Sequence, residues 1–501
     1  MKAFLAQLFA KYIVSKDQKW MNRPIETQEK ILMDLISRAK NTKFGKDHHF
    51  DRIHSYDDFK KYVPINDYEG LRPYFDEMVQ GKEDVLWPGK PIYLAKTSGT
   101  TSGTKYIPLT KESIPYHINS ARNTLLHYIH ETGNANFLNG KMIFLQGSPI
   151  LEDKNGLKFG RLSGIVAHYV PQYLQKNRMP SWETNCIEDW ETKVDAVVKE
   201  TMKEDMTLIS GIPPWLIMYF ERLLDKSGEK NIQHLFKNLQ LMVTGGVNYE
   251  PYREKVNQLI GRNIDCLQTY PASEGFIAYQ NTQKEEDLLL LLNNGMFYEF
   301  IPADEFFTEN PTRISIKDVK VGIDYVLILN TNAGLWGYNI GDTIRFTSTS
   351  PYKIVVSGRI KHFTSAFGEH VIAHEVEKAL QQTIEKYSAS VNEFTVAPQV
   401  NPTEGLPYHE WFVEFEKKPE NLEAFAMELD AQMCQQNVYY KDLITGNILR
   451  KLVLTPVVKD GFQSYMKSIG KLGGQNKVPR LANDRAIADE FYAQNLTTNT
   501  K

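Results

Sequence analysis

The stretch Lys96-Thr-Ser-Gly-Thr-Thr-Ser-Gly-Thr-Lys105 follows a short apolar segment, 91–96, that has the composition of a strand. Its glycines and hydroxyl side chains give a backbone that can wrap around a polyanion. Exposed backbone N–H groups and hydroxyls donate to phosphate oxygens, and Lys105 adds a positive charge. The spacing differs from that of the P-loop NTPases, because three residues separate Gly99 from Gly103 where that pattern has four. The stretch predicts a phosphate-binding loop, with a polar surface loop as the alternative.

Further along the chain, two segments carry residue types that suit a nucleotide site. Val243-Thr-Gly-Gly-Val247 has the pattern of a strand that runs into a turn, where glycines let a flat base approach the backbone. A tight turn without a ligand fits the same residues equally well. Thr269-Tyr-Pro-Ala-Ser-Glu-Gly275 follows, and in isolation it also fits a capped helix start.

Three more segments stand out towards the carboxyl end. They are Trp336-Gly-Tyr-Asn-Ile-Gly-Asp342, Ser357-Gly-Arg-Ile-Lys-His-Phe363 and Gly473-Gly-Gln-Asn-Lys-Val-Pro-Arg480. The last of them surrounds Lys477 with glycines, and a lysine in such a loop is ordinarily solvated. None of the GxSxG, HExxH or GxGxxG patterns competes with these segments as a signal of function.

In their order along the chain, from 97 to 480, these segments resemble those of the adenylate-forming enzymes. Thr97-Ser-Gly-Thr-Thr-Ser-Gly-Thr-Lys-Tyr-Ile-Pro108 is similar to their ATP phosphate loop, and more narrowly to that of the auxin-responsive acyl-acid amido synthetase family. Compared with the plant members, one position is deleted between Gly103 and Lys105. The chain is identified as a bacterial member of this family, within the superfamily of acyl-CoA synthetases and luciferases.

The resemblance implies roles for the residues of the first segments. It assigns the ATP phosphates to the loop residues Ser98, Gly99, Thr100, Thr101 and Lys105. It places Gly245, Gly246 and Tyr270 against the adenine, and Ser273 against a phosphate. Glu274 would ligate Mg²⁺, since one carboxylate plus substrate phosphates is a usual magnesium site.

The later segments gain roles from the same resemblance. Asp342 would accept both ribose hydroxyls, a task that suits the two oxygens of a carboxylate. Asn339 stands where many relatives carry arginine. Arg359 would touch ribose or phosphate, and Lys361 would be the hinge between two domains. Lys477 would be a mobile catalytic lysine, with Glu274 as the second catalytic residue.

The acid-binding site has the weakest signal in the sequence. Plant relatives often place an arginine near the acid in the helix predicted over 111–131, and Arg122 lies there. A surface salt bridge is the alternative for Arg122. Trp215 and Tyr219 follow the turn at 213–214 and have the size to line an acid pocket, although core packing is the expected role for both.

The resemblance implies ATP-dependent activation of a carboxylic acid as an acyl-adenylate, with ATP and Mg²⁺ as cofactors. An amine, expected to be an amino acid, would then displace AMP and give an amide. Two alternatives stay open: an acyl-CoA ligase that shares the first half-reaction, and a non-catalytic nucleotide-binding protein.

Composition narrows the class of protein independently of any motif. Of the 501 residues, 42% are hydrophobic and 12% aromatic, which excludes disorder over most of the length. The formal net charge of −3 argues against a nucleic-acid partner. The three cysteines lie far apart, so neither a disulfide framework nor a zinc site is expected, and a cytoplasmic location fits best.

The first residues raise the question of a membrane segment. Phe4, Leu5, Leu8, Phe9, Tyr12 and Ile13 fall at helical spacing, while Gln7 and Lys11 interrupt the apolar run of a signal peptide. The pattern predicts an amphipathic helix whose apolar side packs on the body of the protein. Attachment to a membrane surface is the alternative, but no membrane partner is expected.

Secondary-structure patterns predict an α/β protein of two parts. Residues 1–90 are expected to be mostly helical, and strands alternate with helices between 90 and 350, which favours a largely parallel sheet. After 355 the pattern is that of a small α+β domain. We therefore expect an ATP- and acid-binding domain over 1–357 and a mobile C-terminal cap over 358–501.

Overall fold

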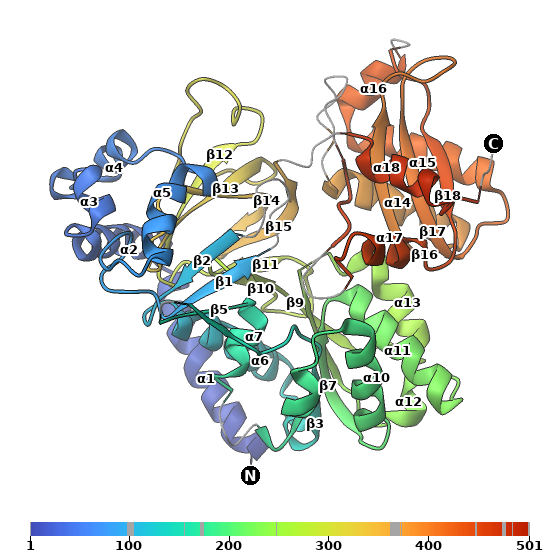
Figure 1. The fold of residues 1–501 in the computed structure, drawn as a ribbon, viewed down its shortest axis with the longest axis horizontal. Helices are drawn as coiled ribbons and strands as arrows, with labels where there is room; N and C mark the ends of the chain where they lie inside the picture. The colour runs from blue at the N-terminus through green and yellow to red at the C-terminus, as the bar shows by residue number, and fades with distance from the viewer. Residues whose placement is uncertain are drawn as a thin grey trace. The chain divides into compact units, whose positions relative to one another are not determined.

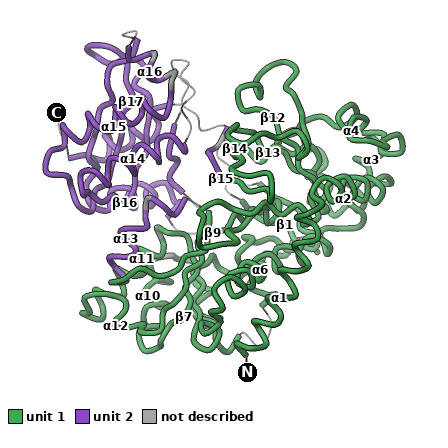
Figure 2. The backbone as a smooth tube through the Cα atoms, turned by 180° about the vertical axis from the view of Figure 1, so that it is seen from behind, with its two compact units in different colours: residues 1–247, 260–355 green, residues 248–259, 356–501 purple. Residues whose placement is uncertain are grey.

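The computed structural model describes residues 2–97, 105–154, 156–170, 175–246, 248–360, 371, 373–445, 448–472, 477–482 and 484–498. Contacts divide the chain into two compact units (Figure 2). Unit 1 comprises 1–247 and 260–355, and unit 2 comprises 248–259 and 356–501. The expected α/β class, with a large first unit and a smaller second one, is confirmed.

Unit 1 begins with helices, as the sequence predicts. They are α1 (Lys2–Met21), α2 (Pro24–Ala39), α3 (Lys43–Asp47), the 3₁₀ helix η1 (Phe50–Arg52), α4 (Tyr56–Tyr62) and α5 (Tyr68–Val79). Proline opens α2, where its missing N–H has no cost. The side chains of Ser55 and Asp67 cap α4 and α5 by accepting hydrogen bonds from backbone N–H groups.

A four-stranded sheet in the order β2-β1-β5-β4 follows these helices. Its strands are β1 (Tyr93–Thr97), β2 (Lys105–Leu109), β4 (Glu152–Lys154) and β5 (Leu157–Gly160). Strands β1 and β2 are antiparallel, and Thr97 pairs with Lys105. The register therefore brings the two ends of the 98–104 stretch together.

The main sheet of unit 1 has the strand order β12-β13-β14-β15-β11-β10-β9-β8-β7-β3-β6. Its parallel half consists of β6 (Arg178–Met179), β3 (Lys141–Phe144), β7 (Met206–Gly211), β8 (Leu241–Gly245) and β9 (Asp265–Pro271). The helices along this part of the chain are α6 (Ile114–Thr132), η2 (Asn136–Asn139), α7 (Leu162–Ala167), α9 (Trp182–Asn185), α10 (Trp190–Thr201), α11 (Pro213–Ser227) and α12 (Ile232–Leu235).

The other half of this sheet corrects the expectation of a largely parallel sheet. Its strands are β10 (Phe276–Tyr279), β11 (Leu288–Leu290), β12 (Met296–Pro302), β13 (Asp324–Thr331), β14 (Tyr338–Thr349) and β15 (Tyr352–Arg359). The pairs β9–β10, β10–β11, β11–β15, β12–β13 and β13–β14 are antiparallel. No helix separates these strands in the described chain, and a short connection can join only antiparallel neighbours.

Unit 2 is an α+β unit, as predicted (Figure 1). Its sheet has the order β16-β17-β18, with β16 (Ser390–Gln399), β17 (Tyr408–Lys417) and β18 (Val453–Val457). Its helices are α13 (Glu250–Ile260), α14 (Ala373–Tyr387), α15 (Leu422–Gln436), α16 (Val438–Thr445), α17 (Gly461–Ser468) and α18 (Ala486–Ala493). Phe394 and Trp411 stack in its core.

Helix α1 packs on unit 1 through a different face from the one expected. The side chains that it buries are Ala10, Ile13, Asp17 and Trp20. Of the predicted apolar stripe only Ile13 is buried, whereas Phe4, Leu5, Leu8, Phe9 and Tyr12 are exposed. The small side chain of Ala10 and the polar partners of Asp17 explain why this face, although less apolar, packs on the protein.

None of the helices in the described ranges combines the length with the apolar character that crossing a lipid bilayer demands.

Candidate functional site

The structure joins two of the predicted nucleotide segments through a side-chain contact in unit 1. The Tyr270 hydroxyl donates a hydrogen bond to Asp342 Oδ2, although the two residues lie 72 positions apart. Tyr270 belongs to β9 and Asp342 to β14, and both side chains are half-buried. A carboxylate has about four lone-pair positions. Asp342 therefore keeps acceptor capacity beyond this bond.

A tight turn between β9 and β10 carries Ser273 and Glu274. The backbones of Ala272 and Gly275 exchange hydrogen bonds of 3.0 and 3.2 Å across it. Ser273 is buried and Glu274 half-buried. A Cβ on Gly275 would lie 2.2 Å from the Met296 sulfur, so a larger residue there would require the Met296 side chain to move. The alternative of a capped helix start is wrong for this segment, because it lies between two antiparallel strands.

Gly245 and Gly246 lie at the end of β8, beside the start of the Tyr270 segment. Gly245 pairs with Thr269 across the parallel strands β8 and β9. A Cβ on Gly245 would lie 2.6 Å from Thr269 Oγ1, and Gly246 has a φ of +85°. Both positions therefore require glycine for the backbone itself. The register places this turn next to Tyr270, as a shared adenine site would need.

Two left-handed glycines shape the segment that leads to Asp342. Gly337 has a φ of +55° and Gly341 a φ of +89°. A Cβ on Gly337 would lie 2.2 Å from the Pro64 carbonyl oxygen. The side-chain oxygen of Asn339 accepts a hydrogen bond of 2.8 Å from Gly341 N. Asn339 is thus a buried turn residue here.

A loop residue from the N-terminal helical region holds the same segment. Asn66 N donates to Gly337 O and Asn66 O accepts from Asn339 N, both at 2.7 Å. The Asn66 amide also donates to Trp336 O at 3.1 Å. Trp336 is fully buried, and its indole N–H donates to Leu86 O at 3.0 Å. These bonds fix the backbone before Asp342 from both sides.

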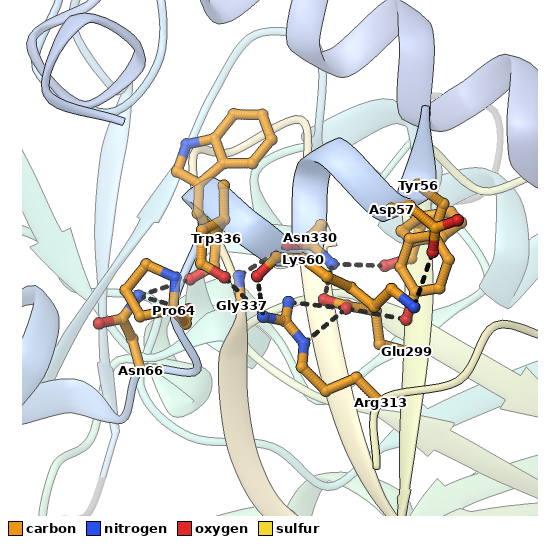
Figure 3. Close-up of polar contacts among 12 residues, drawn as sticks. Tyr56, Asp57, Lys60, Pro64, Asn66, Glu299, Arg313, Asn330, Trp336 and Gly337 are labelled. Carbon is orange, nitrogen blue, oxygen red and sulfur yellow. Dashed lines mark hydrogen bonds and ion pairs between the residues drawn. The ribbon is translucent and has the colours of Figure 1, made fainter. Parts of the chain in front are cut away.

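Behind this segment lies a buried ion pair, shown in Figure 3. Arg313 donates to Glu299 Oε1 through Nε at 3.0 Å and Nη2 at 2.7 Å, and Glu299 is fully buried. Asn330 donates to Glu299 Oε2 at 2.9 Å and accepts from Gly337 N at 2.6 Å. The Tyr56 hydroxyl donates to Glu299 at 3.1 Å. This network, the Arg313 cluster, anchors Gly337 to the core.

The predicted phosphate loop is described only at its flanks. Ser98, Gly99, Thr100 and Thr101 lie outside the described residues. Lys105 opens β2, and its ammonium lies 5.5 Å from the centre of the Tyr68 ring, in cation–π range.

In unit 2, Lys477 opens the described segment 477–482, whose next residues are tied to β16. Thr395 Oγ1 donates to Pro479 O at 2.6 Å, and Val396 N donates to Arg480 O at 3.0 Å. Lys477 itself is exposed. The backbone that carries this lysine is thus anchored three residues after it.

The Arg480 side chain, which is largely buried, strengthens this anchor. It forms ion pairs with Glu393 and, at 3.5 Å, with Glu377, and it donates to Phe394 O at 3.1 Å and to the Tyr252 hydroxyl. Tyr252 in turn donates to Glu393 Oε2 at 3.2 Å. Burial raises the pKa of Glu377, and Arg480 opposes that rise. We name these residues of α13, α14, β16 and the Lys477 segment the Arg480 cluster.

The remaining predicted residues are distributed over both units. Arg359 ends β15, and neither its side chain nor Lys361 belongs to the described part of the chain. Arg122 is exposed on α6, with its guanidinium 5.3 Å from the centre of the Phe9 ring of α1. Its assignment to the acid stays a prediction. Trp215 and Tyr219 are buried, which confirms the expected core packing.

Sequence reasoning missed the partners of Arg480 and those of Gly337. Arg480 itself closes the segment around Lys477 and was visible there. Its partners lie 87 and 228 positions away, and no local pattern links them. Among the described residues, no group of three or more His, Cys, Asp and Glu side chains is placed to hold a metal ion.

Comparisons with known proteins give the chain its family. The model of the GH3 family N-terminal domain matches residues 15–185, that of the central domain 289–359 and that of the C-terminal domain 374–486. A jasmonoyl–L-amino acid synthetase, JAR4 of Nicotiana attenuata, is 22% identical over 64% of this chain and 65% of its own length. The indole-3-acetic acid-amido synthetase GH3.15 of Arabidopsis thaliana is 23% identical over 92% of this chain and 91% of its own. The chain thus spans slightly less than two thirds of the first of these relatives.

Solved structures agree on the fold. The acyl acid amido synthetase AtGH3.15 in complex with 2,4-DB has a TM-score of 0.81 at 16% identity, covering 98% of this chain and 96% of that one. A 2-hydroxyisobutyryl-CoA ligase in the postadenylation state has a TM-score of 0.60 at 13% identity, covering 96% and 92%. The fold is that of adenylate-forming enzymes, and with three matching domain models over more than half of its residues the chain belongs to the GH3 family.

Proposed function

We propose that this protein is an ATP-dependent acyl-acid amido synthetase. It adenylates a carboxylic acid and transfers the acyl group to an amine, for which an amino acid is the expected acceptor. The observation that carries the proposal is the hydrogen bond between Tyr270 and Asp342, because it joins two segments that the family resemblance assigns to one nucleoside. Family membership supports it, and so do the two relatives named a jasmonoyl–L-amino acid synthetase and an indole-3-acetic acid-amido synthetase.

The nucleoside would lie against the end of β8 and β9. Gly245 and Gly246 would let the flat face of the adenine approach the backbone, with Tyr270 next to the Gly245 partner in the sheet. Asp342 would accept the ribose hydroxyls, which requires the Tyr270 hydroxyl to share or leave the carboxylate. Arg359 would contact ribose or phosphate.

The phosphates would lie at the 98–104 stretch, with Ser98, Gly99, Thr100 and Thr101 as donors and Lys105 as a charge. Ser273 would add a donor, and Glu274 would hold Mg²⁺. Glu274 suits Mg²⁺ because it presents a half-buried carboxylate at a fixed turn. A single carboxylate suffices where substrate phosphates complete the coordination shell of the ion. When bound, the ion neutralises charge on the phosphates.

In the first half-reaction, a carboxylate oxygen of the acid bonds to the α-phosphorus and the bond to pyrophosphate breaks. The Lys477 ammonium would stabilise the negative charge that grows on the α-phosphate. In the second, the amine nitrogen bonds to the acyl carbon, loses a proton, and AMP leaves. Arg122 would position the acid, and movement of the C-terminal cap about Lys361 would change the site between the two steps.

Acid-dependent exchange of labelled pyrophosphate into ATP tests the first step. A panel of carboxylic acids should include at least one that drives exchange, whereas a non-catalytic nucleotide-binding protein would show none. Amino acids and coenzyme A, supplied in turn as acceptors, then distinguish the amido synthetase from an acyl-CoA ligase, which the fold alone would also accommodate. A cytoplasmic location and a bacterial source remain predictions.

Asp342→Ala tests the nucleoside assignment. A hydrogen bond to a charged group contributes about 1.5–3 kcal/mol, so ATP and AMP should both bind roughly ten- to a hundredfold more weakly. Pyrophosphate, which lacks the ribose, should bind as before. Unchanged AMP affinity in a folded variant would refute the assignment.

A further inference from the structure

The outer side of α1 carries an apolar patch that unit 1 leaves uncovered. Phe4, Leu5, Leu8, Phe9 and Tyr12 are 62%, 57%, 53%, 40% and 63% exposed. Their spacing places all five along one side of the helix over its first three turns. Figures 1 and 2 both show α1 along the outer margin of unit 1, beside α6. We name these five residues the α1 patch.

Polar contacts hold the opposite side of α1 against the protein, so the helix cannot roll to bury the patch. Asp17 lies 3.0 Å from His127 Nε2 of α6 and accepts a hydrogen bond of 3.1 Å from Trp20 Nε1. Gln7 donates to Gly133 O at 2.7 Å. Turning the helix over would leave Asp17 and His127 buried without each other, which is costly. The patch is therefore a fixed feature of the surface.

The exposed charges on α1 itself have one sign. The exposed charged residues of α1 are the lysines Lys2, Lys11, Lys16 and Lys19, whereas its one carboxylate, Asp17, is buried. On α6, Arg122 lies over the Phe9 ring. The single carboxylate of α6, Glu131, accepts hydrogen bonds from Thr282 and from Gln283 N.

A hollow in the surface brings two of these lysines together with His130 of α6. Lys11, Lys19 and His130 line it, together with Val14, Ser15, Gln18 and Asn22. It thus places cationic side chains next to the apolar patch, where an anionic headgroup beside buried acyl chains would need them.

We propose that α1 binds the surface of a membrane that contains anionic phospholipid. Aromatic and leucine side chains on one side of a helix, with lysines beside them, are the composition of helices that lie in the lipid interface. The α1 patch would enter the boundary between headgroups and acyl chains, and the lysines would face lipid phosphates. The sequence alone favours burial of this stripe; the structure presents it to solvent.

Charge favours lipid over a second copy of the chain as the occupant. A symmetric dimer through the patch would place the same surface on both sides, because such interfaces are isologous. Lysines of one α1 would then face lysines of the other, with no exposed carboxylate on either helix to pair with them. An anionic lipid surface supplies the missing negative charge.

Flotation of the full chain with lipid vesicles tests the proposal. The wild type should float with vesicles of phosphatidylcholine and phosphatidylglycerol at low salt and bind them about tenfold less at high salt. It should bind little to vesicles of pure phosphatidylcholine. Phe4→Ser/Leu8→Ser/Tyr12→Ser should weaken binding by about tenfold or more. Lys11→Gln/Lys16→Gln/Lys19→Gln should weaken it similarly and remove most of the salt dependence.

Matched controls use exposed residues of unit 1 away from α1. Phe307→Ser/Ile323→Ser removes other exposed apolar side chains, and Lys199→Gln/Lys230→Gln/Lys237→Gln removes the same charge. Both should float like the wild type, and near-ultraviolet circular dichroism verifies that every variant is folded. Absence of flotation by the wild type, or equal flotation of all variants, overturns the proposal. A second result would also overturn it: light scattering that shows a wild-type dimer, absent in the Phe4/Leu8/Tyr12 variant, while the wild type binds no vesicles. The occupant of the patch would then be a second copy of the chain.

Discussion

The two units each place a largely buried arginine behind a candidate active-site residue, but the charges around it differ. In unit 1, Arg313 faces one carboxylate, Glu299, which also accepts hydrogen bonds from neutral groups. In unit 2, Arg480 faces two carboxylates, Glu377 and Glu393. The Arg313 cluster is neutral, whereas the Arg480 cluster has one negative charge in excess.

This difference teaches how firmly each arginine is required. Without Arg313, the buried Glu299 would still accept hydrogen bonds from its neutral partners Tyr56 and Asn330. Without Arg480, two carboxylates would remain close together, and like charges in one buried site resist ionising together. We therefore expect the stability of unit 2 to depend more strongly on Arg480 than that of unit 1 depends on Arg313. The segment that carries Lys477 should share this dependence.

The largest expected effect follows from Arg480→Met. Removal of one partner from a buried ion pair costs about 3–5 kcal/mol, and the excess charge places this variant near the upper end. Hydrogen exchange of peptides from α13 and β16, followed by mass spectrometry, measures the loss of local stability in unit 2. Adding Glu377→Gln should restore part of the protection. Unchanged exchange in these peptides would show that the cluster does not hold unit 2 together.

Lys477→Ala separates the chemistry of this segment from its anchoring. Adenylation should fall by roughly 10²–10³, the usual cost of losing one transition-state donor. Transfer of the acyl group from a supplied acyl-adenylate should fall far less, because the proposed role of Lys477 ends when pyrophosphate leaves. Lys471→Ala, another exposed lysine of unit 2, is the matched control. Equal losses in both half-reactions would contradict this role.

Arg313→Met should cost less than Arg480→Met, about 3 kcal/mol, because Glu299 keeps its hydrogen bonds from Tyr56 and Asn330. Hydrogen exchange in peptides that contain β12 and β14 reports this loss in unit 1. AMP should bind somewhat more weakly, since Gly337 loses part of its support. If Arg313→Met proved more harmful than Arg480→Met, the charge argument would be wrong.

A smaller effect concerns acid. His117 of α6 is buried, and burial lowers its pKa from 6.5 to about 4. Between these values the unfolded chain binds the proton and the folded one does not, so stability falls as the pH drops through this window. At one pH unit below 6.5 the loss is about 1.4 kcal/mol. Unfolding midpoints of His117→Gln, measured against pH, should show a shallower acid slope than wild type.

Unit 2 provides the contrast to that prediction. Burial raises the pKa values of Glu377 and Glu414, so their contribution to stability is present at low pH and is lost as the pH rises above their ordinary values. Glu414→Gln should therefore reduce the stability that unit 2 loses as the pH rises. His117→Gln, by contrast, should reduce the stability that unit 1 loses as the pH falls. Hydrogen exchange of each unit at several pH values tests both signs, and equal signs would contradict the assignment of these groups.

Local patterns predicted most elements of the fold. The strand expected over 91–96 is β1 (Tyr93–Thr97), the helix expected over 111–131 is α6 (Ile114–Thr132), and unit 2 has the expected α+β order. Such periods in apolar residues are short-range signals. The antiparallel half of the main sheet was missed, because strand direction depends on how short the connections are and on pairing between distant segments.

The site shows the same boundary between local and distant information. The segments around Tyr270, Asp342 and Lys477 could be recognised, because their residue types and order are written in the chain. The contact of Tyr270 with Asp342 and the burial of Arg480 could not, since each depends on partners far away in sequence. The docking face of α1 was mispredicted. The spacing of apolar residues shows which side of a helix is apolar, but it does not show whether another part of the protein covers that side.

Helix α13 has a consequence for how the protein is made. It lies between β8 and β9 of unit 1 in the chain, yet its residues 250–259 belong to unit 2. Tyr252 leaves the ribosome 228 residues before its partner Arg480. At about 5–20 residues per second, that interval lasts roughly ten to fifty seconds. During translation the Arg480 cluster is therefore among the last sets of contacts to form. A fragment that starts at 356 would lack Tyr252 and could not form the complete cluster.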